Sequence, residues 1–336
     1  MPLTAPARVI GRAVSFALAF ALAFAAASAV AQDPIGSGYP NRAVKVIAPS
    51  SPGGGFDLVG RVLAQKLSEQ LGQPFVVENR PGAGTLVGTQ AVVKSAADGY
   101  TLLVGGLSNI ALNMGMYKAP GYDALVDLVP ISLVVSHSYM LVGRKDLPHS
   151  SLTEILAFAR ANPGKLVFAT SGSGSGQHVG AAIILKETGV DMLMVPYKGA
   201  QPVYQDLLAG RVDLFYDNTT TARPYVESGQ VKGIAVSSKD RANGLSQVPT
   251  IAESGLPAWE MESWFGWFAP AKTPQPVLDR LRSEIDKATR SAEVRSRLEQ
   301  GSGRSLRLSV AETESLLRSE VPKWVGLIRK AGVTVD

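Results

Sequence analysis

Short apolar runs typical of strands alternate with amphipathic helical patterns along most of this chain of 336 residues. Runs such as 45–48, 75–78 and 101–104 end in glycine-rich turns, and helices are predicted after the first two of these turns. Strands separated by helices predict an α/β fold with mainly parallel sheets covered on both faces. Ligands of such sheets bind outside the carboxyl ends of the strands, and the glycine-rich loops fall at those ends.

The first of these loops lies in residues 45–57, where a strand meets Gly53, Gly54 and Gly55. Glycines let the backbone approach a bound group closely, and the free N–H groups of the following helix favour an anion. The loop lacks the lysine of a P-loop and the spacing of a dinucleotide site. It therefore predicts a cradle for a carboxylate or phosphate, with close packing of the turn as the alternative. Asp57, at the mouth of the helix, is predicted to act as its N-cap, with a water-mediated ligand contact as a second role.

A second polar loop, over residues 170–176, follows the predicted strand 166–169 and precedes a predicted helix, 177–188. Its hydroxyls and amides suit a carboxylate. His178 is predicted either to contact ligand or to tether the loop. Asp217 closes another strand, where it would orient water, bind a cation or cap the next helix. His137 and His149 have no Asp, Glu or Cys partners at metal spacing, so no zinc site is predicted, and no cofactor is predicted either.

The N-terminal residues predict export from the cytoplasm. Arg8 and Arg12 precede an apolar run over residues 14–27, and Ala29-Val30-Ala31 fits a signal-peptidase site, which predicts cleavage after Ala31 and a periplasmic protein. A membrane anchor is the alternative, but the run is shorter than the roughly 20 residues that a span needs. The lysines and arginines are dispersed, which argues against a nucleic-acid surface. Cysteine is absent, so the fold must hold without disulfides.

The C-terminal third begins with an aromatic segment, residues 259–270, which holds three tryptophans and two phenylalanines. We interpret it as a buried strand between domains, with an aromatic ligand box as the alternative. Helices follow over 276–289, 292–300 and 310–330, the last kinked or broken at Pro322.

Several short motifs also carry a family resemblance over residues 39–335. They occur in the order Pro49-x-x-Pro52-Gly53-Gly54-Gly55-x-Asp57, Glu78-Asn79-Arg80-Pro81-Gly82-Ala83-Gly84, Asp98-Gly99-Tyr100, Val195-Pro196-Tyr197-Lys198-Gly199, Asp217-Asn218 and Val248-Pro249-Thr250. This order resembles the substrate-binding proteins of tripartite tricarboxylate transporters, also called the Bug family. The resemblance implies a two-lobed periplasmic binding fold of type II-like architecture, which closes on a small carboxylate and delivers it to a membrane permease without catalysis.

The resemblance also implies a division into lobes and a set of ligand contacts. We expect residues 39–133 and 259–336 to form lobe 1 and residues 134–258 to form lobe 2, in a monomeric protein. The implied carboxylate lies between the first-strand loop and a facing loop of lobe 2, held by backbone amides and ordered waters. The predicted ligand-binding residues are Ser51, Gly53, Gly54, Gly55, Phe56, Asp57, Gly106, Ser108, Asn109, Thr170, Ser171, Gly172, Ser173, Ser175, Gln177, His178, Tyr197, Gly199 and Asp217.

Two positions depart from the family pattern. Phe56 stands where threonine is common and cannot donate a hydroxyl hydrogen bond, and residues 106–109 lack the usual Thr-Ser-Gly run. Phe56 therefore either stacks on an aromatic or longer carboxylate or packs at the rim of the closed cleft.

No nucleophile–base pair, metal cluster or cofactor fingerprint supports an enzyme. A mono- or dicarboxylate receptor for a permease is the main hypothesis, and a sensor that feeds a membrane kinase is the alternative. We expect residues 51–57 and 170–177 to close on one carboxylate without a basic side chain. A large residue at Gly54 or Gly174 is then expected to block binding and leave the fold intact.

Overall fold

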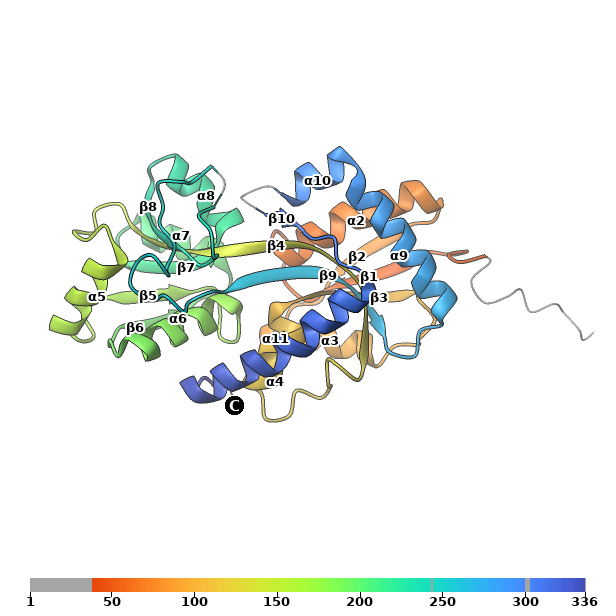
Figure 1. The fold of residues 1–336 in the computed structure, drawn as a ribbon, viewed down its shortest axis with the longest axis horizontal. Helices are drawn as coiled ribbons and strands as arrows, with labels where there is room; N and C mark the ends of the chain where they lie inside the picture. Colours follow the sequence, from red (N-terminus) through yellow and green to blue (C-terminus); the bar gives the residue numbers. More distant parts are fainter. Residues whose placement is uncertain (1–37, 243, 300–302, 336) are drawn as a thin grey trace, which may run out of the picture. The chain divides into compact units, whose positions relative to one another are not determined.

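The computed structural model describes residues 38–242, 244–299 and 303–335. Residues 40–336 form one compact unit, to which everything below is confined. Figure 1 shows the order of its helices and strands. The predicted signal peptide and its cleavage site after Ala31 lie outside the described residues.

Ten strands of the described residues form one continuous sheet with two parts. In the first part, β1 lies between β2 and β3, all three are parallel, and β9 then pairs antiparallel with β3. These strands are β1 (Val44–Ala48), β2 (Phe75–Asn79), β3 (Thr101–Gly106) and β9 (Glu262–Pro270). The predicted parallel arrangement is therefore confirmed for the three strands that alternate with helices.

Helices cover the first part of the sheet on two sides. One group packs together above the strands in Figure 1: α2 (Gly55–Leu71), α9 (Gln275–Arg290) and α10 (Ala292–Leu298). The other group lies below them: η1 (Ala83–Thr85), α3 (Leu86–Val93), the π-helical turn η2 (Ser108–Leu112), α4 (Asn113–Met116) and α11 (Val310–Ala331). The apolar residues of α2 that were spaced at three and four, such as Val59 and Leu63, are fully buried.

The second part of the sheet is built from β4 (Leu128–Arg144), β5 (Val167–Thr170), β6 (Leu193–Pro196), β7 (Leu214–Asn218) and β8 (Val231–Val236). The strand β5 is parallel to both β6 and β7, whereas β4 runs antiparallel to β7 and β8. Its helices are α5 (Leu152–Ala161), α6 (Gly176–Thr188), α7 (Ala200–Leu208) and α8 (Thr219–Glu227). Ser151 and Glu154 form a capping box at the start of α5.

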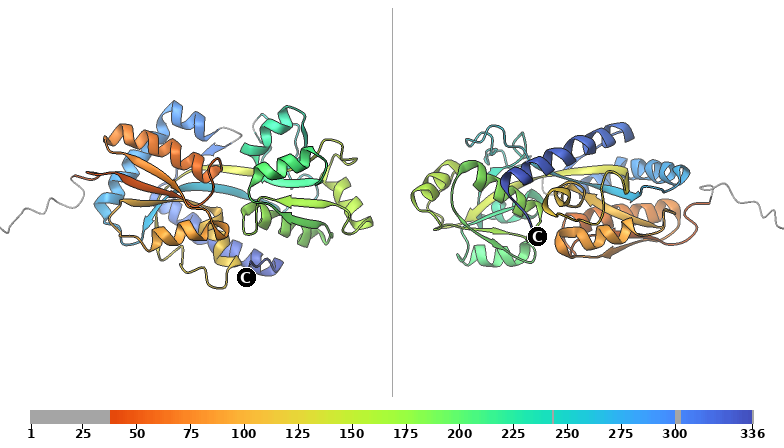
Figure 2. Two further views of the ribbon diagram at one scale, coloured as in Figure 1. Left: turned by 180° about the vertical axis from the view of Figure 1, so that it is seen from behind. Right: turned by 90° about the horizontal axis from the view of Figure 1, so that it is seen from below.

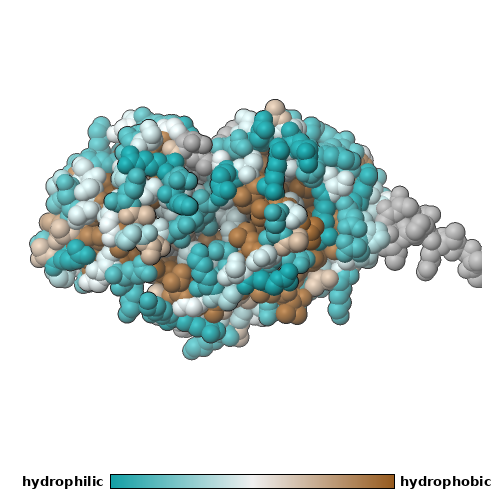
Figure 3. All heavy atoms as spheres, viewed as in Figure 1, coloured by the Kyte–Doolittle hydropathy of each residue, from teal (hydrophilic) through white to brown (hydrophobic). Residues whose placement is uncertain are grey.

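Two long strands connect the parts. β4 is 17 residues long; it pairs with β9 as far as Ser138 and with β7 from Tyr139 onward. Figure 1 and the rear view in Figure 2 show β4 and β9 running from one group of helices to the other. The β-branched run at residues 131–142 is thus part of a strand that both lobes share. In the same view as Figure 1, Figure 3 shows hydrophilic residues over most of the face and hydrophobic ones gathered near its middle.

The C-terminal third agrees with the sequence except at one proline. The aromatic segment becomes β9, whose Trp264 and Trp267 side chains are buried, so the buried-strand interpretation is confirmed. The helix α11 continues through Pro322 without a break. A proline lacks one N–H donor, but buried contacts of Leu317 and Trp324 on the same helix hold the two turns in place. The small β10 (Arg304–Ser305) adds to β4 beside this region.

Candidate functional site

A small cavity lies where the glycine loop meets the start of α8. Its volume is about 40 Å³, and it is lined by Gly53, Gly54, Gly55, Leu58, His137, Asn218, Thr220, Thr221 and Phe265. These residues come from the β1–α2 connection, from both long strands and from the first turn of α8. The site therefore combines the predicted first-lobe loop with a segment of the second lobe that follows β7.

The glycine loop lies directly on the Phe265 ring. A Cβ added at Gly55 would come within 2.7 Å of this ring, so only glycine allows the helix to start here. Gly53 has a φ of +86°, which also favours glycine. At Gly54, the N-cap of α2, a Cβ would meet nothing closer than 3.7 Å. The free amides of the first helical turn are therefore the groups that this loop offers to an anion.

Asp57 is held by the loop and does not line the cavity. Its carboxylate accepts hydrogen bonds from the Gly53 N–H at 3.1 Å, the Asn79 amide at 2.9 Å and the Arg61 guanidinium at 2.9 Å. Burial alone would raise the pKa of the carboxyl, but the hydrogen bonds from Arg61, Gly53 and Asn79 outweigh it and hold the pKa below its usual value. The predicted N-cap role is wrong, because Gly54 is the cap and Asp57 reaches back from inside the helix.

Phe56 packs behind the site. Its ring meets Phe265 edge-on at 5.1 Å between centroids, and only 8% of the residue is exposed. This burial fits neither of the two predicted positions, a surface that stacks on ligand or a place at the cleft rim. Phe56 instead packs against Phe265, and Phe265 lines the cavity. The preference for an aromatic ligand that Phe56 suggested therefore has no support from its position.

The segment after β3 is a structural support and lies outside the cavity lining. The Asn109 side chain accepts from the Gly106 N–H at 2.8 Å and donates to the Thr89 hydroxyl at 3.0 Å, and Asn109 is fully buried. A Cβ at Gly106 would come within 2.9 Å of the Trp264 carbonyl oxygen. Ser108 is also buried, in the π-helical turn. Gly106 in this segment packs against the rings of Phe56 and Phe265.

The loop at residues 170–176 is bonded mainly within its own lobe. Ser175 caps α6 by accepting from the His178 N–H at 3.1 Å and donates to the Gly172 carbonyl at 2.7 Å. The Ser171 carbonyl accepts from the Gly199 N–H. Ser173 is exposed. None of these residues lines the cavity beside Gly53–Gly55.

Thr170 and Tyr197 also have polar groups that do not line this cavity. Thr170 is fully buried, and within the described residues its hydroxyl has no hydrogen-bond partner. The Tyr197 hydroxyl donates to Asp206 at 2.7 Å, so its polar end is engaged away from the cavity. Both positions stay predictions as ligand contacts.

Gly174 brings the second-lobe loop to a different part of the first lobe. A Cβ at Gly84, in η1, would lie 3.5 Å from the Gly174 Cα. Gly174 itself has a φ of +79°, which strains any other residue. Replacement of Gly174 therefore costs stability as well as space, whereas the open surroundings of Gly54 favour an intact fold there, and both expectations stay predictions.

Asp217 is a buried acid next to the cavity. It accepts from the Gln177 amide at 3.2 Å and from the Tyr204 hydroxyl at 3.1 Å, and it has no exposed surface. Burial raises its pKa to about 6. The helix α8 starts two residues later, at Thr219, with Asn218 as N-cap, so the predicted capping role is wrong. Asp217 fixes Gln177, and with it the start of α6, against β7.

Six lining residues were not predicted from the sequence: Leu58, His137, Asn218, Thr220, Thr221 and Phe265. The His137 Nδ1 lies 2.8 Å from the Thr220 hydroxyl, and burial lowers the His137 pKa to about 4, so the ring is neutral at physiological pH. Asn218 has a buried side-chain oxygen without a partner among the described residues. The signal that could have found this segment is the same strand-end rule that pointed to the glycine loop, applied to β7.

The nine lining residues include no lysine or arginine, so the site holds no full positive charge that could pair with an anion. The amides of α2 and α8 carry partial positive charge at their N-termini. Within residues 38–335, gaps aside, no group of three or more His, Cys, Asp or Glu is placed to hold a metal. In the same part of the chain, no helix combines the length and apolar character of a membrane span.

The chain is similar to solved binding proteins over nearly their whole length. A family model described as tripartite tricarboxylate transporter family receptor matches residues 59–333. The periplasmic binding protein BugD is 34% identical with a TM-score of 0.81, and the match covers 88% of this chain and 99% of BugD. Rpa4515 of R. palustris, solved with adipate, is 33% identical with a TM-score of 0.82, over 88% and 98% of the two chains. MatC of Rhodopseudomonas palustris, solved with malate, is 29% identical with a TM-score of 0.80, over 86% and 100%.

These matches confirm the two-lobed α/β fold and the family resemblance read from the motifs. They also confirm a binding protein rather than an enzyme, because the family and its solved members bind substrates. The chain therefore belongs to the tripartite tricarboxylate transporter receptor family, the Bug family, whose members are periplasmic solute-binding proteins.

Proposed function

We propose that this protein captures a small aliphatic dicarboxylate in the cavity between Gly53–Gly55 and the first turn of α8, and delivers it to a membrane permease. The observation that carries the proposal is the lining itself: two helix N-termini face one cavity that has no lysine or arginine side chain. The ligands of two solved relatives, adipate and malate, are both dicarboxylates.

The arrangement explains how a carboxylate is held. Each helix N-terminus contributes about 0.3–1 kcal/mol when exposed and up to about 2 kcal/mol when partly buried. Exclusion of water strengthens these dipoles, so affinity depends on how tightly the lobes enclose the ligand. The cavity of about 40 Å³ is far smaller than the roughly 300–1,000 Å³ of ordinary ligand pockets, so a ligand enters when the lining segments move apart.

The remaining lining residues suit the second end of a dicarboxylate. His137 and Thr220 form a neutral hydrogen-bonded pair, and the Asn218 side chain provides a further polar group. Phe265 and Leu58 supply apolar walls for the carbon chain. A neutral histidine donates one hydrogen bond without attracting every anion, which favours selection by shape and length.

The proposal extends to the organisation of the protein. We assign residues 39–133 and 259–336 to lobe 1 and residues 134–258 to lobe 2, near the point where β4 changes partner. The chain is exported with cleavage after Ala31 and acts as a monomer in the periplasm. The membership of a transporter receptor family supports a permease as its partner.

Calorimetric titration of ligand-free protein with malate, adipate and their diamides tests the ligand class. We expect a dicarboxylate to bind and its neutral diamide to bind at least about tenfold more weakly, since hydrogen bonds to charged groups are worth about 1.5–3 kcal/mol. Gly54→Leu should fill the cavity and abolish binding. Gly326→Leu, at an exposed glycine of α11 with open surroundings, is the matched control and should bind normally. Equal affinity for acid and diamide would overturn the proposal.

A further inference from the structure

A second, larger pocket lies away from the site between the glycine loop and α8. Its volume is about 460 Å³, and it is formed by α6, the C-terminal turns of α11 and the segment that leads into β9. The two pockets share no lining residue. Ligand pockets commonly have volumes of about 300–1,000 Å³ and mainly apolar walls, and this pocket meets both conditions. We call it the α6–α11 pocket.

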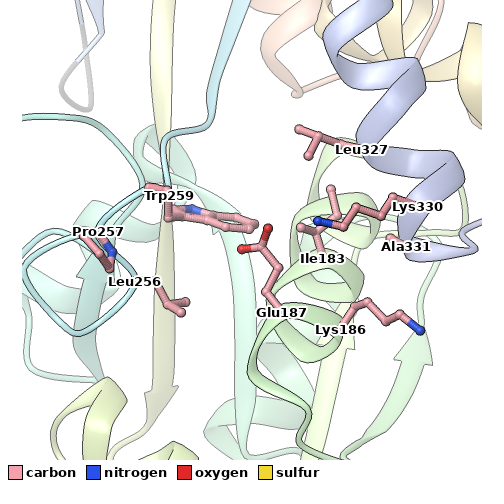
Figure 4. A pocket seen from close by; sticks show the side chains of 10 residues that line it. Ile183, Lys186, Glu187, Leu256, Pro257, Trp259, Leu327, Lys330 and Ala331 are labelled. Atoms are coloured by element: carbon pink, nitrogen blue, oxygen red, sulfur yellow. The ribbon is translucent and has the colours of Figure 1, made fainter.

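Most of the wall is apolar. Figure 4 shows the Trp259 ring reaching into the space in front of α6, with Leu256 on its own side and Ile183 and Leu327 across from it. Trp259 is 7% exposed, so one face of a fixed aromatic ring borders the pocket. Such a surface takes an apolar or aromatic group of ordinary side-chain size.

Two opposite charges face the same space. In Figure 4 the Glu187 carboxylate is directed towards Trp259, the Lys330 ammonium towards the pocket interior, and Lys186 points away. Among the described residues, neither Glu187 nor Lys330 lies within 4.0 Å of an oppositely charged group. A simple anion would meet Glu187 and a simple cation would meet Lys330, and each such like-charge contact opposes binding. A molecule that carries both charges satisfies both side chains.

We propose that the α6–α11 pocket is a second ligand site that binds a small zwitterion with an apolar body, of the chemical class of an apolar or aromatic α-amino acid. The ligand carboxylate pairs with Lys330 and the ligand ammonium with Glu187. The apolar body lies against Trp259, between Ile183 and Leu327. This site is separate from the proposed dicarboxylate site, and its occupancy does not require Gly54.

Three molecules with the same phenyl body test the charge requirement. These are L-phenylalanine, 3-phenylpropanoate, which lacks the ammonium, and 2-phenylethylamine, which lacks the carboxylate. The reporter is the Trp259 indole N–H signal in proton–nitrogen NMR spectra of the full protein, identified by its loss in Trp259→Phe. We expect phenylalanine to shift this signal with an affinity about tenfold higher than either analogue.

Variants separate this site from nonspecific binding. Lys330→Gln should reduce phenylalanine to the affinity of 2-phenylethylamine, and Glu187→Gln should reduce it to that of 3-phenylpropanoate. Arg329→Gln removes a neighbouring charge from the same helix outside the pocket and should leave the titration unchanged. Gly54→Leu should also leave it unchanged, which excludes binding in the dicarboxylate site. No shift of the Trp259 signal, equal binding of all three molecules, or an Arg329→Gln effect as large as that of Lys330→Gln would overturn the proposal.

Discussion

Replacement of Asp57 by alanine should destabilise the protein and loosen the glycine loop. Two of its partners, the Gly53 N–H and the Asn79 amide, are partly buried and would lose a charged acceptor. Each such hydrogen bond is worth about 1.5 kcal/mol at the low end for charged groups. The Arg61 pair adds about 0.5 kcal/mol at most, because the arginine side chain is 52% exposed. The expected total is about 3 kcal/mol, well above the roughly 1 kcal/mol of a simple helix cap.

Scanning calorimetry at pH 7 measures this loss as a fall in Tm of about 6 °C, at roughly 2 °C per kcal/mol for a chain of this size. The matched control is Asp286→Ala, which removes the same kind of i,i+4 pair with Arg290 where both side chains are more than half exposed. It should lower Tm by about 1 °C or less. Equal effects of the two variants would refute the reasoning, because they would show that the loop bonds of Asp57 contribute nothing.

The pH dependence provides a second check on Asp57. Its folded-state pKa lies below its ordinary value, so its contribution to stability is present above pH 4 and is lost as the pH falls through the folded-state pKa. The difference between wild type and Asp57→Ala should therefore shrink as the pH falls below 4. A constant difference across this range would mean that the charge on Asp57 is not what anchors the loop.

Four further outcomes are expected. Gly174→Ala should cost about 1 kcal/mol or more because its φ of +79° is left-handed, while Gly54→Ala should leave the urea midpoint nearly unchanged. Ser175→Ala should cost about 1 kcal/mol in the same assay through loss of the α6 cap. The folded-state pKa of Asp217 is raised to about 6, so wild-type stability should fall by up to about 3 kcal/mol as the pH rises from 4 to 6. Asp217→Asn should remove this pH dependence, and the same pH dependence in the variant would contradict the assignment. N-terminal sequencing of periplasmic protein should begin at Gln32, and a membrane-bound product that retains residues 1–31 would exclude cleavage.

Much of this protein follows from its sequence, because the determining interactions are local. The alternation of apolar runs with 3–4 spaced helices determined the parallel β1–β3 arrangement, and the capping box at Ser151 and Glu154 determined where α5 begins. The glycines at the start of α2 also predicted a close approach of the backbone, which the structure shows between Gly55 and Phe265. The order of short motifs was sufficient to identify the family.

The pairing of distant segments was decided only by the tertiary structure. The sequence of residues 170–176 does not show that Gly174 lies next to Gly84. The sequence of the glycine loop likewise does not show that Gly53–Gly55 faces Asn218 and Thr220 rather than residues 170–176. Those contacts depend on how the paired strands β4 and β9 place one lobe relative to the other. The residues that meet are therefore far apart in sequence, and local patterns do not predict them. Burial is equally nonlocal: Phe56 and Asp57 adjoin the glycine loop in sequence, yet packing turns both away from the cavity they were expected to line.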